Sequence, residues 1–331
     1  MSSTIKDIAK KAGVSYSTVS RALNDYPEVN KQTKKKILKI AMEMQYQPNA
    51  LARGLVKKET KTIGLLIPDI TNPFYPELAK GVEDAANEAG YSIFLCNTNW
   101  SEKREENYLA VLQQKHIDGL IMSPSSDATE HLQYISSSGL KVVFIDSKIQ
   151  IVNCTSIIIN NARGGQMATE HLIQKGHKDI AFIGGQQDNF PTQERLKGYR
   201  SALNDFNIQI NKNHIQFGNY SRESGYNIMC YLLKSDKKPT AVFAANDVIA
   251  LGVIQAIKKF ELSIPSDIAV VGFDGIEYAS LPEIQLSTIS QPIYEMGKIS
   301  LNTLINQLSK NEQTISQLIM LEPELIIRGT S

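Results

Sequence analysis

The chain has 331 residues, of which 42% are hydrophobic and 21% are charged, and its formal net charge is +1. This length fits two or three domains, and this hydrophobic content supports packed cores and argues against disorder. The near-neutral total conceals an asymmetry, because residues 1–60 hold 12 basic and 5 acidic side chains whereas the remainder holds 23 basic and 29 acidic ones. A basic head on an acidic body indicates a nucleic-acid-binding module joined to another kind of domain.

The sequence carries no signature of secretion or membrane insertion. Cys96, Cys154 and Cys230 lie far apart and show neither metal-binding nor redox spacing, so we expect free thiols in a reducing compartment. The first residues lack the apolar core of a signal peptide, and no apolar run is long enough to cross a bilayer. We therefore expect a cytoplasmic protein without a membrane partner, which disfavours a secreted solute-binding protein.

Residues 4–24 predict two short helices joined by a tight turn. Thr4 and Asp7 have the spacing of a capping box, and Gly13 permits a sharp turn after the first helix. Ser15 caps a second helix. The outward side chains of this helix are mostly short and hydrogen-bonding: Tyr16, Ser17, Thr18, Ser20, Arg21 and Asn24. Such a face suits a helix in the DNA major groove, where small groups allow close approach to base edges.

A third helix is expected from about residue 31 to residue 45, capped by Asn30, with its apolar side on the first two helices. Lysines gather at its start and on its outer side: Lys34, Lys35, Lys36 and Lys39. A solvated face and contacts to DNA phosphates are equally good interpretations of these lysines.

Residues 48–60 form a separate connecting segment. Residues 49–56 have the pattern of two helical turns with Leu55 on the apolar side, and so short a helix is marginal alone in water. It needs DNA or a second subunit as a partner. The alternative is a linker without regular structure, which Gly54 favours. A segment that forms a helix only when DNA is bound would fit both interpretations.

From residue 61 the pattern changes to alternating strands and helices. The strand-like runs are 62–68, 91–97, 118–123, 141–146, 156–160, 179–185, 241–247, 269–275 and 286–291, and a last strand is expected at 325–329. This alternation predicts an α/β architecture of two doubly wound parallel sheets, with chain crossings near residues 160 and 291. We divide the chain into a helix-turn-helix domain at 1–47, a hinge at 48–60 and a two-lobed domain at 61–331. Its first lobe spans about 61–160 and 292–322, and its second about 161–291 and 323–331.

Ligands of doubly wound sheets bind beyond the carboxyl ends of the strands, where this sequence places polar and aromatic residues. The set is Asn72, Phe74, Tyr75, Asp146, Arg195, Tyr220, Asn246, Asp274 and Gln291, with Arg195 expected to open a helix. Carboxylates and a guanidinium bind adjacent hydroxyls, and aromatic faces cover the C–H side of a sugar ring. The set therefore suits a monosaccharide.

An enzymatic function is disfavoured. Two strand-end carboxylates could act as acid and base, but nothing orients a nucleophile. No glycine-rich phosphate loop follows the first strand, and Gly184 and Gly185 lack the rest of a dinucleotide fingerprint. The five histidines show no metal spacing. We expect no catalytic residue, no metal and no cofactor.

The pattern VS-x-x-TVSR-x-LN at residues 14–24 resembles the helix-turn-helix of the LacI/GalR family of transcription regulators, and the similarity continues to the end of the chain. It implies a two-lobed core of the type I periplasmic-binding-protein fold. Leu55 would match the hinge-helix leucine that this family inserts into the minor groove. The expected DNA contacts are Thr4, Ser15, Tyr16, Ser17, Thr18, Ser20, Arg21, Asn24, Asn49, Ala50, Arg53 and Leu55.

The expected effector site is similar to that of bacterial ribose-binding proteins and of the ribose repressors in this family. The nine residues at the strand ends match the sugar-contacting positions, except that Tyr220 replaces a Phe. Ser147, which follows Asp146, stands where the binding proteins carry an Arg that grips sugar hydroxyls. Ribose is favoured as the effector, and another pentose or a hexose stays open.

The resemblance implies a homodimeric repressor that is released from a palindromic operator by a sugar. A dimer is expected rather than a tetramer because no heptads follow the last strand. Within the family, the alternative is a catabolite-control regulator with a phosphorylated carrier protein as corepressor, and the opposite sign of the sugar effect also stays open. In another class, the alternative is a cytoplasmic sugar-binding or sugar-converting protein.

Overall fold

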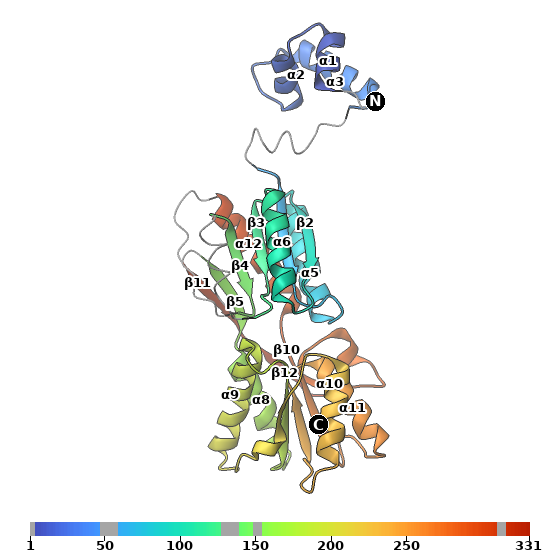
Figure 1. Cartoon of the computed structure of the whole chain (residues 1–331), viewed down its shortest axis with the longest axis vertical. Coiled ribbons are helices and arrows are strands. Elements are labelled where there is room, and N and C mark those ends of the chain that lie inside the picture. The colour runs from blue at the N-terminus through green and yellow to red at the C-terminus, as the bar shows by residue number, and fades with distance from the viewer. Residues whose placement is uncertain (1–3, 47–58, 127–138, 148–153, 310–315) are drawn as a thin grey trace. The chain divides into compact units, whose positions relative to one another are not determined.

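The computed structural model describes residues 4–46, 59–126, 139–147, 154–309 and 316–331. The chain divides into two compact units, Met1–Thr60 and Lys61–Ser331 (Figure 1). The predicted hinge contacts Asn49, Ala50, Arg53 and Leu55 lie outside the described residues.

The first unit, called here the three-helix unit, contains α1 (Ile5–Ala12), α2 (Tyr16–Leu23) and α3 (Lys31–Glu43). Its core is small, and the side chains of Ile8, Val19 and Ile37, one from each helix, are completely buried in it. Because such a core involves few residues, the unit depends on well-formed helix ends as well as on apolar contacts.

The helix ends of this unit are capped by the residues that the sequence predicts. The Thr4 hydroxyl accepts a hydrogen bond from the Asp7 N–H at 3.4 Å, and the Asp7 carboxylate accepts one from the Thr4 N–H at 2.9 Å. The Ser15 hydroxyl accepts from the Thr18 N–H at 3.1 Å, and Asn30 caps α3 in the same way. Gly13 ends α1 with a φ of 68°, a left-handed conformation that glycine adopts without a steric penalty.

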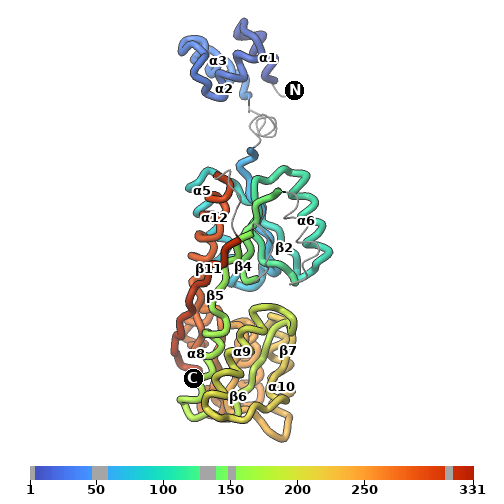
Figure 2. The backbone as a smooth tube through the Cα atoms, turned by 90° about the vertical axis from the view of Figure 1, so that its left-hand side faces the viewer, coloured from blue at the N-terminus to red at the C-terminus, as the bar shows by residue number. Residues whose placement is uncertain are grey.

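The second unit begins with a lobe whose sheet has the strand order β11-β5-β4-β3-β1-β2, all parallel. The strands are β1 (Thr62–Ile67), β2 (Ser92–Asn97), β3 (Gly119–Met122), β4 (Lys141–Ile145), β5 (Thr155–Ile159) and β11 (Gln317–Leu321). The described helices are α5 (Phe74–Glu88), α6 (Glu102–Gln114) and α12 (Ile293–Ser309). Figure 2 shows β11 beside β5 at one edge of this sheet.

The alternation of side chains along β1 explains the layers of this lobe. Ile63 and Leu65 pack into the core formed with α5 and α12, whereas Leu66 packs on the other side with α6. Successive side chains of a strand point to opposite faces, so both faces of the sheet receive an apolar cover. The two helices on the first face approach closely, since a Cβ on Gly81 would lie 2.1 Å from the Tyr294 carbonyl oxygen.

The second lobe has the strand order β12-β10-β9-β8-β6-β7, with β12 antiparallel to β10 and the other pairs parallel. Its strands are β6 (Ile180–Gly184), β7 (Ile215–Phe217), β8 (Ala241–Ala244), β9 (Ala269–Asp274), β10 (Ser287–Ser290) and β12 (Glu324–Ile326). Its helices are α8 (Asn161–Gln174), α9 (Phe190–Asp205), α10 (Arg222–Leu233) and α11 (Asp247–Lys259), with short 3-10 turns η1 (Lys212–His214) and η2 (Glu277–Ser280).

Within the described residues, the chain passes between the two lobes three times, from β5 to α8, from β10 to α12 and from β11 to β12. The first two passages lie near residues 160 and 291, where the sequence predicts them. The predicted architecture, a helical N-terminal domain with a two-lobed, mainly parallel α/β core, is confirmed. β7 and β11 are additional strands that the sequence pattern does not predict. No disulfide joins Cys96, Cys154 and Cys230, all of which lie in the described residues.

Candidate functional site

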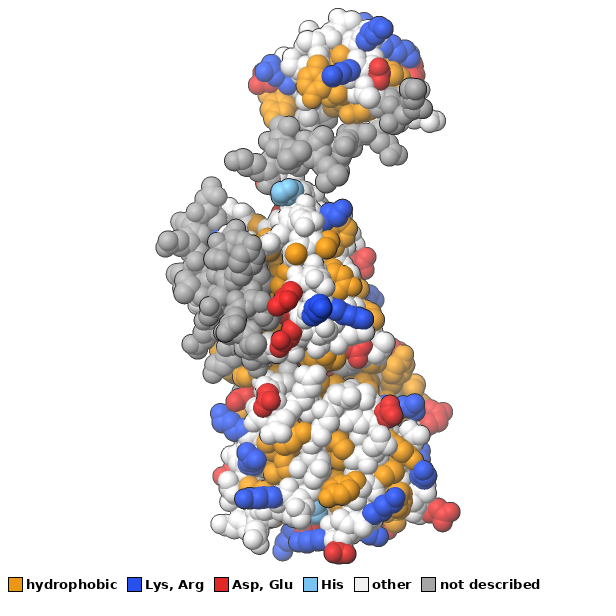
Figure 3. Space-filling model, viewed as in Figure 1, with side chains coloured by type: hydrophobic (Ala, Val, Ile, Leu, Met, Phe, Trp, Pro, Cys, Tyr) orange, Lys and Arg blue, Asp and Glu red, His pale blue; other side chains and the backbone are white. Residues whose placement is uncertain are grey.

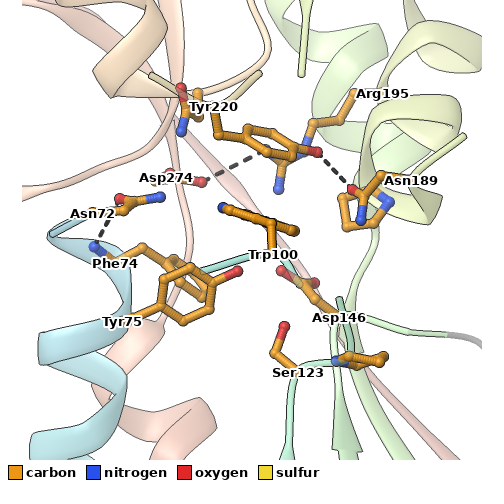
Figure 4. A pocket seen from close by; sticks show the side chains of 13 residues that line it. Asn72, Phe74, Tyr75, Trp100, Ser123, Asp146, Asn189, Arg195, Tyr220 and Asp274 are labelled. Carbon is orange, nitrogen blue, oxygen red and sulfur yellow. Dashed lines mark hydrogen bonds and ion pairs between the residues drawn. The ribbon is translucent and has the colours of Figure 1, made fainter. Parts of the chain in front are cut away.

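The carboxyl ends of the strands in both lobes of the second unit surround a cleft. Eight of the residues predicted from the sequence line it: Asn72, Phe74, Tyr75, Asp146, Arg195, Tyr220, Asn246 and Asp274. The expectation that ligands bind beyond the carboxyl ends of the strands, called here the strand-end rule, therefore identifies residues that are up to 202 positions apart in the sequence and lie in one cleft. Figure 4 shows side chains from both lobes directed into the same space.

Arg195 is the cationic centre of the cleft. It lies in the second turn of α9 rather than at the start of that helix, which corrects the position expected from the sequence. Its Nε donates to Asn161 at 2.8 Å, its Nη1 lies 3.6 Å from Asp274 Oδ1, and its guanidinium stands 3.7 Å from the centre of the Phe273 ring. Only 3% of the residue is exposed, so these contacts fix the guanidinium in place.

Asp146 and Asp274 supply two buried carboxyl groups. Each follows or ends a strand with a positive φ, 53° and 114° respectively, a conformation that non-glycine residues rarely adopt. Burial raises the pKa of both carboxyl groups, and the neighbouring Arg195 guanidinium opposes that rise. Gln291 donates from its side-chain amide to Asp274 Oδ1 at 2.8 Å, which holds this carboxylate from behind. Strained backbone and buried charge at one place are typical of a binding site.

Two buried polar atoms of the cleft lack a hydrogen-bond partner among the described residues. They are Asp146 Oδ1, an acceptor when ionised, and the side-chain amide nitrogen of Asn246, a donor. Asn246 already uses its oxygen to cap α11 by accepting from the Ile249 N–H at 2.8 Å. Because buried polar atoms normally have partners, this donor and acceptor indicate a ligand that offers both functions, as hydroxyl groups do.

Aromatic rings enter the cleft from both lobes. Phe74 and Tyr75, at the start of α5, contact each other edge to face with ring centroids 5.0 Å apart. Tyr220, in the second lobe, has a hydroxyl 2.6 Å from Thr192 Oγ1, and it donates to Asn189 Oδ1 at 2.6 Å. Burial raises the pKa of Tyr220 to about 12, so this hydroxyl stays protonated at neutral pH. The fixed rings can cover the apolar face of a small ligand.

Five further residues line the cleft and are not in the predicted set: Trp100, Ser123, Pro124, Asn189 and Pro191. They follow β2, β3 and β6, so the same strand-end rule, applied to every strand, would have included them. Two predicted residues do not line the cleft. Ser147 is buried outside it, and Gln291 acts on it only through Asp274.

The predicted DNA-reading residues that the structure describes lie on α2 and at the starts or ends of α1 and α2. Tyr16 is 56% exposed, and Ser17 and Arg21 are also exposed, whereas Val19 and Ala22 face the core. The remaining predicted residues are exposed or half-buried: Thr4, Ser15, Thr18, Ser20 and Asn24. The Ser15 hydroxyl lies 2.7 Å from that of Ser17 and 2.8 Å from that of Thr18, so three hydroxyl groups form one cluster at the helix start.

The lysines of α3 divide into two kinds. Lys36 donates to the Ala12 carbonyl oxygen at 2.9 Å, which satisfies a free carbonyl at the end of α1, and Lys34 forms an ion pair with Asp25. Lys35 and Lys39 are exposed. Figure 3 shows Lys and Arg side chains on the visible face of this unit. Lys34 and Lys36 thus have structural contacts, while Lys35 and Lys39 are open to a polyanion.

The described residues contain no group of three or more His, Cys, Asp or Glu side chains arranged to hold a metal ion. A search of the same residues for a bilayer-spanning helix, long and apolar throughout, finds none.

A three-helix unit with a polar, exposed second helix and a two-lobed unit with a polar and aromatic cleft define a DNA-binding regulator with a ligand-binding core. Residues 4–49 match the family model described as bacterial regulatory proteins, lacI family, and residues 60–324 match periplasmic binding proteins and sugar binding domain of LacI family. The chain belongs to the LacI family of bacterial transcription regulators.

Transcription regulators from several bacteria are similar to this chain over nearly its whole length. The HTH-type transcriptional regulator RegA of Clostridium saccharobutylicum is 41% identical over 332 residues, which covers all of both chains. The ribose operon repressor of Escherichia coli (strain K12) is 38% identical over 335 residues, covering 99% of each chain. Catabolite control protein A of Priestia megaterium is 35% identical over 327 residues, covering 98% of each chain.

Solved structures are similar to both units. A lac repressor dimer bound to operator and the anti-inducer ONPF has a TM-score of 0.88 and 27% identity, covering 100% of this chain and 99% of that chain. A LacI family regulator from Enterococcus faecium with bound ribose has a TM-score of 0.73 and 30% identity, covering 82% of this chain and 98% of that chain.

Proposed function

We propose that the chain is a homodimeric repressor of a sugar-utilisation operon, and that a monosaccharide, with ribose as the first candidate, lowers its affinity for a palindromic operator. The observation that carries the sugar assignment is the cleft itself. It combines the fixed Arg195 guanidinium, two carboxyl groups, an unpartnered donor and acceptor, and aromatic rings from both lobes.

The proposed chemistry of recognition follows from these groups. A monosaccharide presents several adjacent hydroxyl groups, each a donor and an acceptor, and one apolar C–H face. Asp146 Oδ1 would accept from a hydroxyl group, and the Asn246 amide would donate to one. The rings of Phe74, Tyr75 or Tyr220 would cover the C–H face. The similarity to the ribose operon repressor of Escherichia coli and to a ribose-bound regulator from Enterococcus faecium supports ribose as the candidate.

We infer that the operator is read by the exposed face of α2, assisted by the residues at 48–60. The proposed contacts are Thr4, Ser15, Tyr16, Ser17, Thr18, Ser20, Arg21, Asn24, Asn49, Ala50, Arg53 and Leu55. Two copies of the chain would read two half-sites about one helical turn apart. The match to an operator-bound lac repressor dimer supports this arrangement.

Regulation in this proposal is thermodynamic linkage between the two ligands. A sugar lowers operator affinity only if it binds more tightly to the conformation that does not bind operator. By reciprocity, the operator must then lower the affinity for the sugar by the same factor. The effect of the sugar on operator affinity and the effect of the operator on sugar affinity therefore measure the same coupling free energy independently.

A second candidate function is catabolite control, in which a phosphorylated carrier protein acts as corepressor. The similarity to catabolite control protein A of Priestia megaterium, at 35% identity, supports this second candidate. It predicts no calorimetric heat with ribose and tighter operator binding when the phosphoprotein is added.

The test uses the full-length protein and an operator that the protein selects from a pool of random duplexes. Fluorescence anisotropy with the selected duplex and a scrambled duplex measures specificity. A thermal-shift panel of pentoses, hexoses and their phosphates then identifies the sugar. We expect selective binding of a palindrome and at least tenfold weaker operator binding with the stabilising sugar. Equal affinity for both duplexes would refute the proposal that the protein is a sequence-specific regulator. A panel in which no sugar stabilises the protein would refute the proposal that a sugar is its effector.

A further inference from the structure

Trp100 is the single tryptophan of the chain and lies in the cleft, where no part of the proposed function uses it. Its backbone belongs to the first lobe, in the segment that follows β2. Its side chain packs against the apolar core of the second lobe and stacks on Tyr220, with ring centroids 5.3 Å apart and an interplanar angle of 19°. The indole therefore bridges the two lobes across the effector site.

The backbone that presents the indole is strained. Asn99 and Trp100 have φ values of 52° and 58°, so two consecutive residues other than glycine are left-handed. For a bulky side chain this conformation is rare and unfavourable, and it persists only when surrounding contacts enforce it. Here the Trp100 N–H donates to the Pro68 carbonyl at 3.2 Å, and the Asn97 amide donates to Asn99 Oδ1 at 2.6 Å. The local structure thus holds the indole in the cleft at a conformational cost.

The stack leaves no room for a ligand on the Tyr220 ring. Two apolar layers in contact are about 3.5–4 Å apart, so a sugar between the two rings would need roughly twice that separation. The cavity left between the lining side chains has a volume of about 30 Å³, which is enough for about two water molecules. Figure 4 shows the indole in the middle of the cleft, with Tyr220 on one side and Tyr75 on the other.

We propose that the Trp100 indole occupies the place that the effector takes against Tyr220, so that effector binding and the Trp100–Tyr220 stack exclude each other. The effector would enter as the stack separates, by rotation of the indole or by parting of the lobes. Trp100 is then an affinity- and size-determining residue, because a ligand must replace the stacking contact and fit the space that the indole vacates. This inference rests on the sugar-binding function proposed above.

The first test uses the intrinsic fluorescence of the wild-type protein, which reports on Trp100 alone. The probe is the sugar that gives the largest shift in the thermal panel. Saturation with this sugar is expected to shift the emission to longer wavelength and to raise the acrylamide quenching constant, because the displaced indole becomes hydrated. An unchanged spectrum, a shift to shorter wavelength or weaker quenching would overturn the proposal, since each means that the indole stays in the cleft with the sugar.

The second test measures sugar affinity by calorimetry for the wild type, W100A and W100F. Removing the indole abolishes a competing aromatic contact, so W100A is expected to bind the sugar roughly two- to tenfold more tightly. W100F keeps an aromatic ring and is expected to stay within twofold of the wild type. Equal or weaker binding by W100A would make the indole an ordinary wall of the site and would overturn the proposal.

The outcomes separate this inference from the function on which it rests. Thermal unfolding without sugar shows whether W100A is folded, and if it is not, the wild-type fluorescence alone decides. If no sugar in the panel binds the wild type, the sugar-binding function itself fails, and the inference fails with it. If a sugar binds and the indole does not move, only the inference fails.

Discussion

The exposed face of α2 and the cleft, proposed above as the two recognition sites, are built in opposite ways. On α2 the proposed recognition side chains Ser17 and Arg21 are exposed, while Val19 and Ala22 lie in the core. In the cleft, Arg195 and Asp274 line the cavity and are also buried. In this proposal, folding and recognition depend on different residues in the first region and on the same residues in the second.

This difference predicts which substitutions alter recognition without altering the free energy of unfolding. A substitution on α2 alters a surface side chain, and such changes usually shift the free energy of unfolding by less than about 0.5 kcal/mol. A substitution in the cleft removes a partner of buried charges, which is among the most destabilising kinds of change. The predictions below test this contrast and are ordered by their expected effect on stability.

The largest effect is expected for Arg195→Leu. Without the guanidinium, the buried carboxyl groups of Asp146 and Asp274 lose their counter-charge, so the two-lobed unit should lose about 3–5 kcal/mol of unfolding free energy. Sugar binding should become undetectable by calorimetry. Urea unfolding followed by fluorescence measures the first effect. Arg200→Leu, an exposed position on the same helix, is the matched control. Equal loss in both variants would contradict the prediction.

A loss of about 2–5 kcal/mol is expected for Ile37→Ala, and it should be confined to the three-helix unit. Ile37 is completely buried in a core that has few other members. Hydrogen exchange resolved by peptide should be faster within residues 4–46 and unchanged in the two-lobed unit. Leu38→Ala is the control, because Leu38 on the same helix is 45% exposed. Protection that drops equally in both units would show that the units do not fold independently.

A smaller, pH-dependent effect is expected for Asp247→Asn. Burial raises the pKa of the Asp247 carboxyl to about 7, although hydrogen bonds from Thr288, Ile276 and Gly275 oppose the rise. The folded protein then binds a proton that the unfolded chain has released, so the unfolding free energy falls as the pH rises from about 4 to about 7.

In the Asn variant this contribution disappears, and the slope over that pH range should become flatter by up to about 1.4 kcal/mol per pH unit. The amide can still accept from both backbone N–H groups and donate to the Thr288 hydroxyl, so the local geometry is retained. Urea unfolding at one-unit pH steps checks the slope. Asp205→Asn, at the exposed end of α9, serves as control. A slope identical to that of the wild type would refute the assignment to Asp247.

The smallest effect on stability is expected for Arg21→Gln. Because Arg21 is exposed, the unfolding free energy should change by less than about 0.5 kcal/mol. Operator affinity should nevertheless fall roughly tenfold or more, since the proposed contact of Arg21 with a base or phosphate is lost. Anisotropy titrations measure this. Lys178→Gln removes the same charge from an exposed position of the second lobe and should leave operator affinity unchanged. An equal loss of operator affinity in both variants would show that Arg21 acts only through the net charge of the protein.

The parts of the fold that the sequence predicts are those encoded locally. The caps formed by Thr4, Ser15 and Asn30 follow from residue types at helix starts, and the strands follow from apolar runs. β7 has only three residues, all half-buried, and therefore leaves no clear pattern. β11 is an edge strand with exposed positions, and its pairing with β5, in which each residue lies beside one 162 positions earlier, is not visible in local sequence.

The candidate site shows the same division. The strand-end rule finds Asn246 and Asp274 because it needs only strand positions. The rule does not place Gln291 behind Asp274, and it does not pair Lys36 with the Ala12 carbonyl, because both contacts depend on the folded geometry. The stack of Trp100 on Tyr220 is likewise invisible in sequence, since it joins residues 120 positions apart in different lobes.

The passage from β11 to β12 has a consequence for how this protein can be divided. Only Glu322 and Pro323 separate the two strands, one of which edges the first sheet and the other the second. Removing about fifteen residues from the carboxyl terminus would strip a border strand from both sheets in one step. Neither lobe corresponds to one contiguous stretch of polypeptide, so a chain that stops before β11 would lack an edge strand in both lobes.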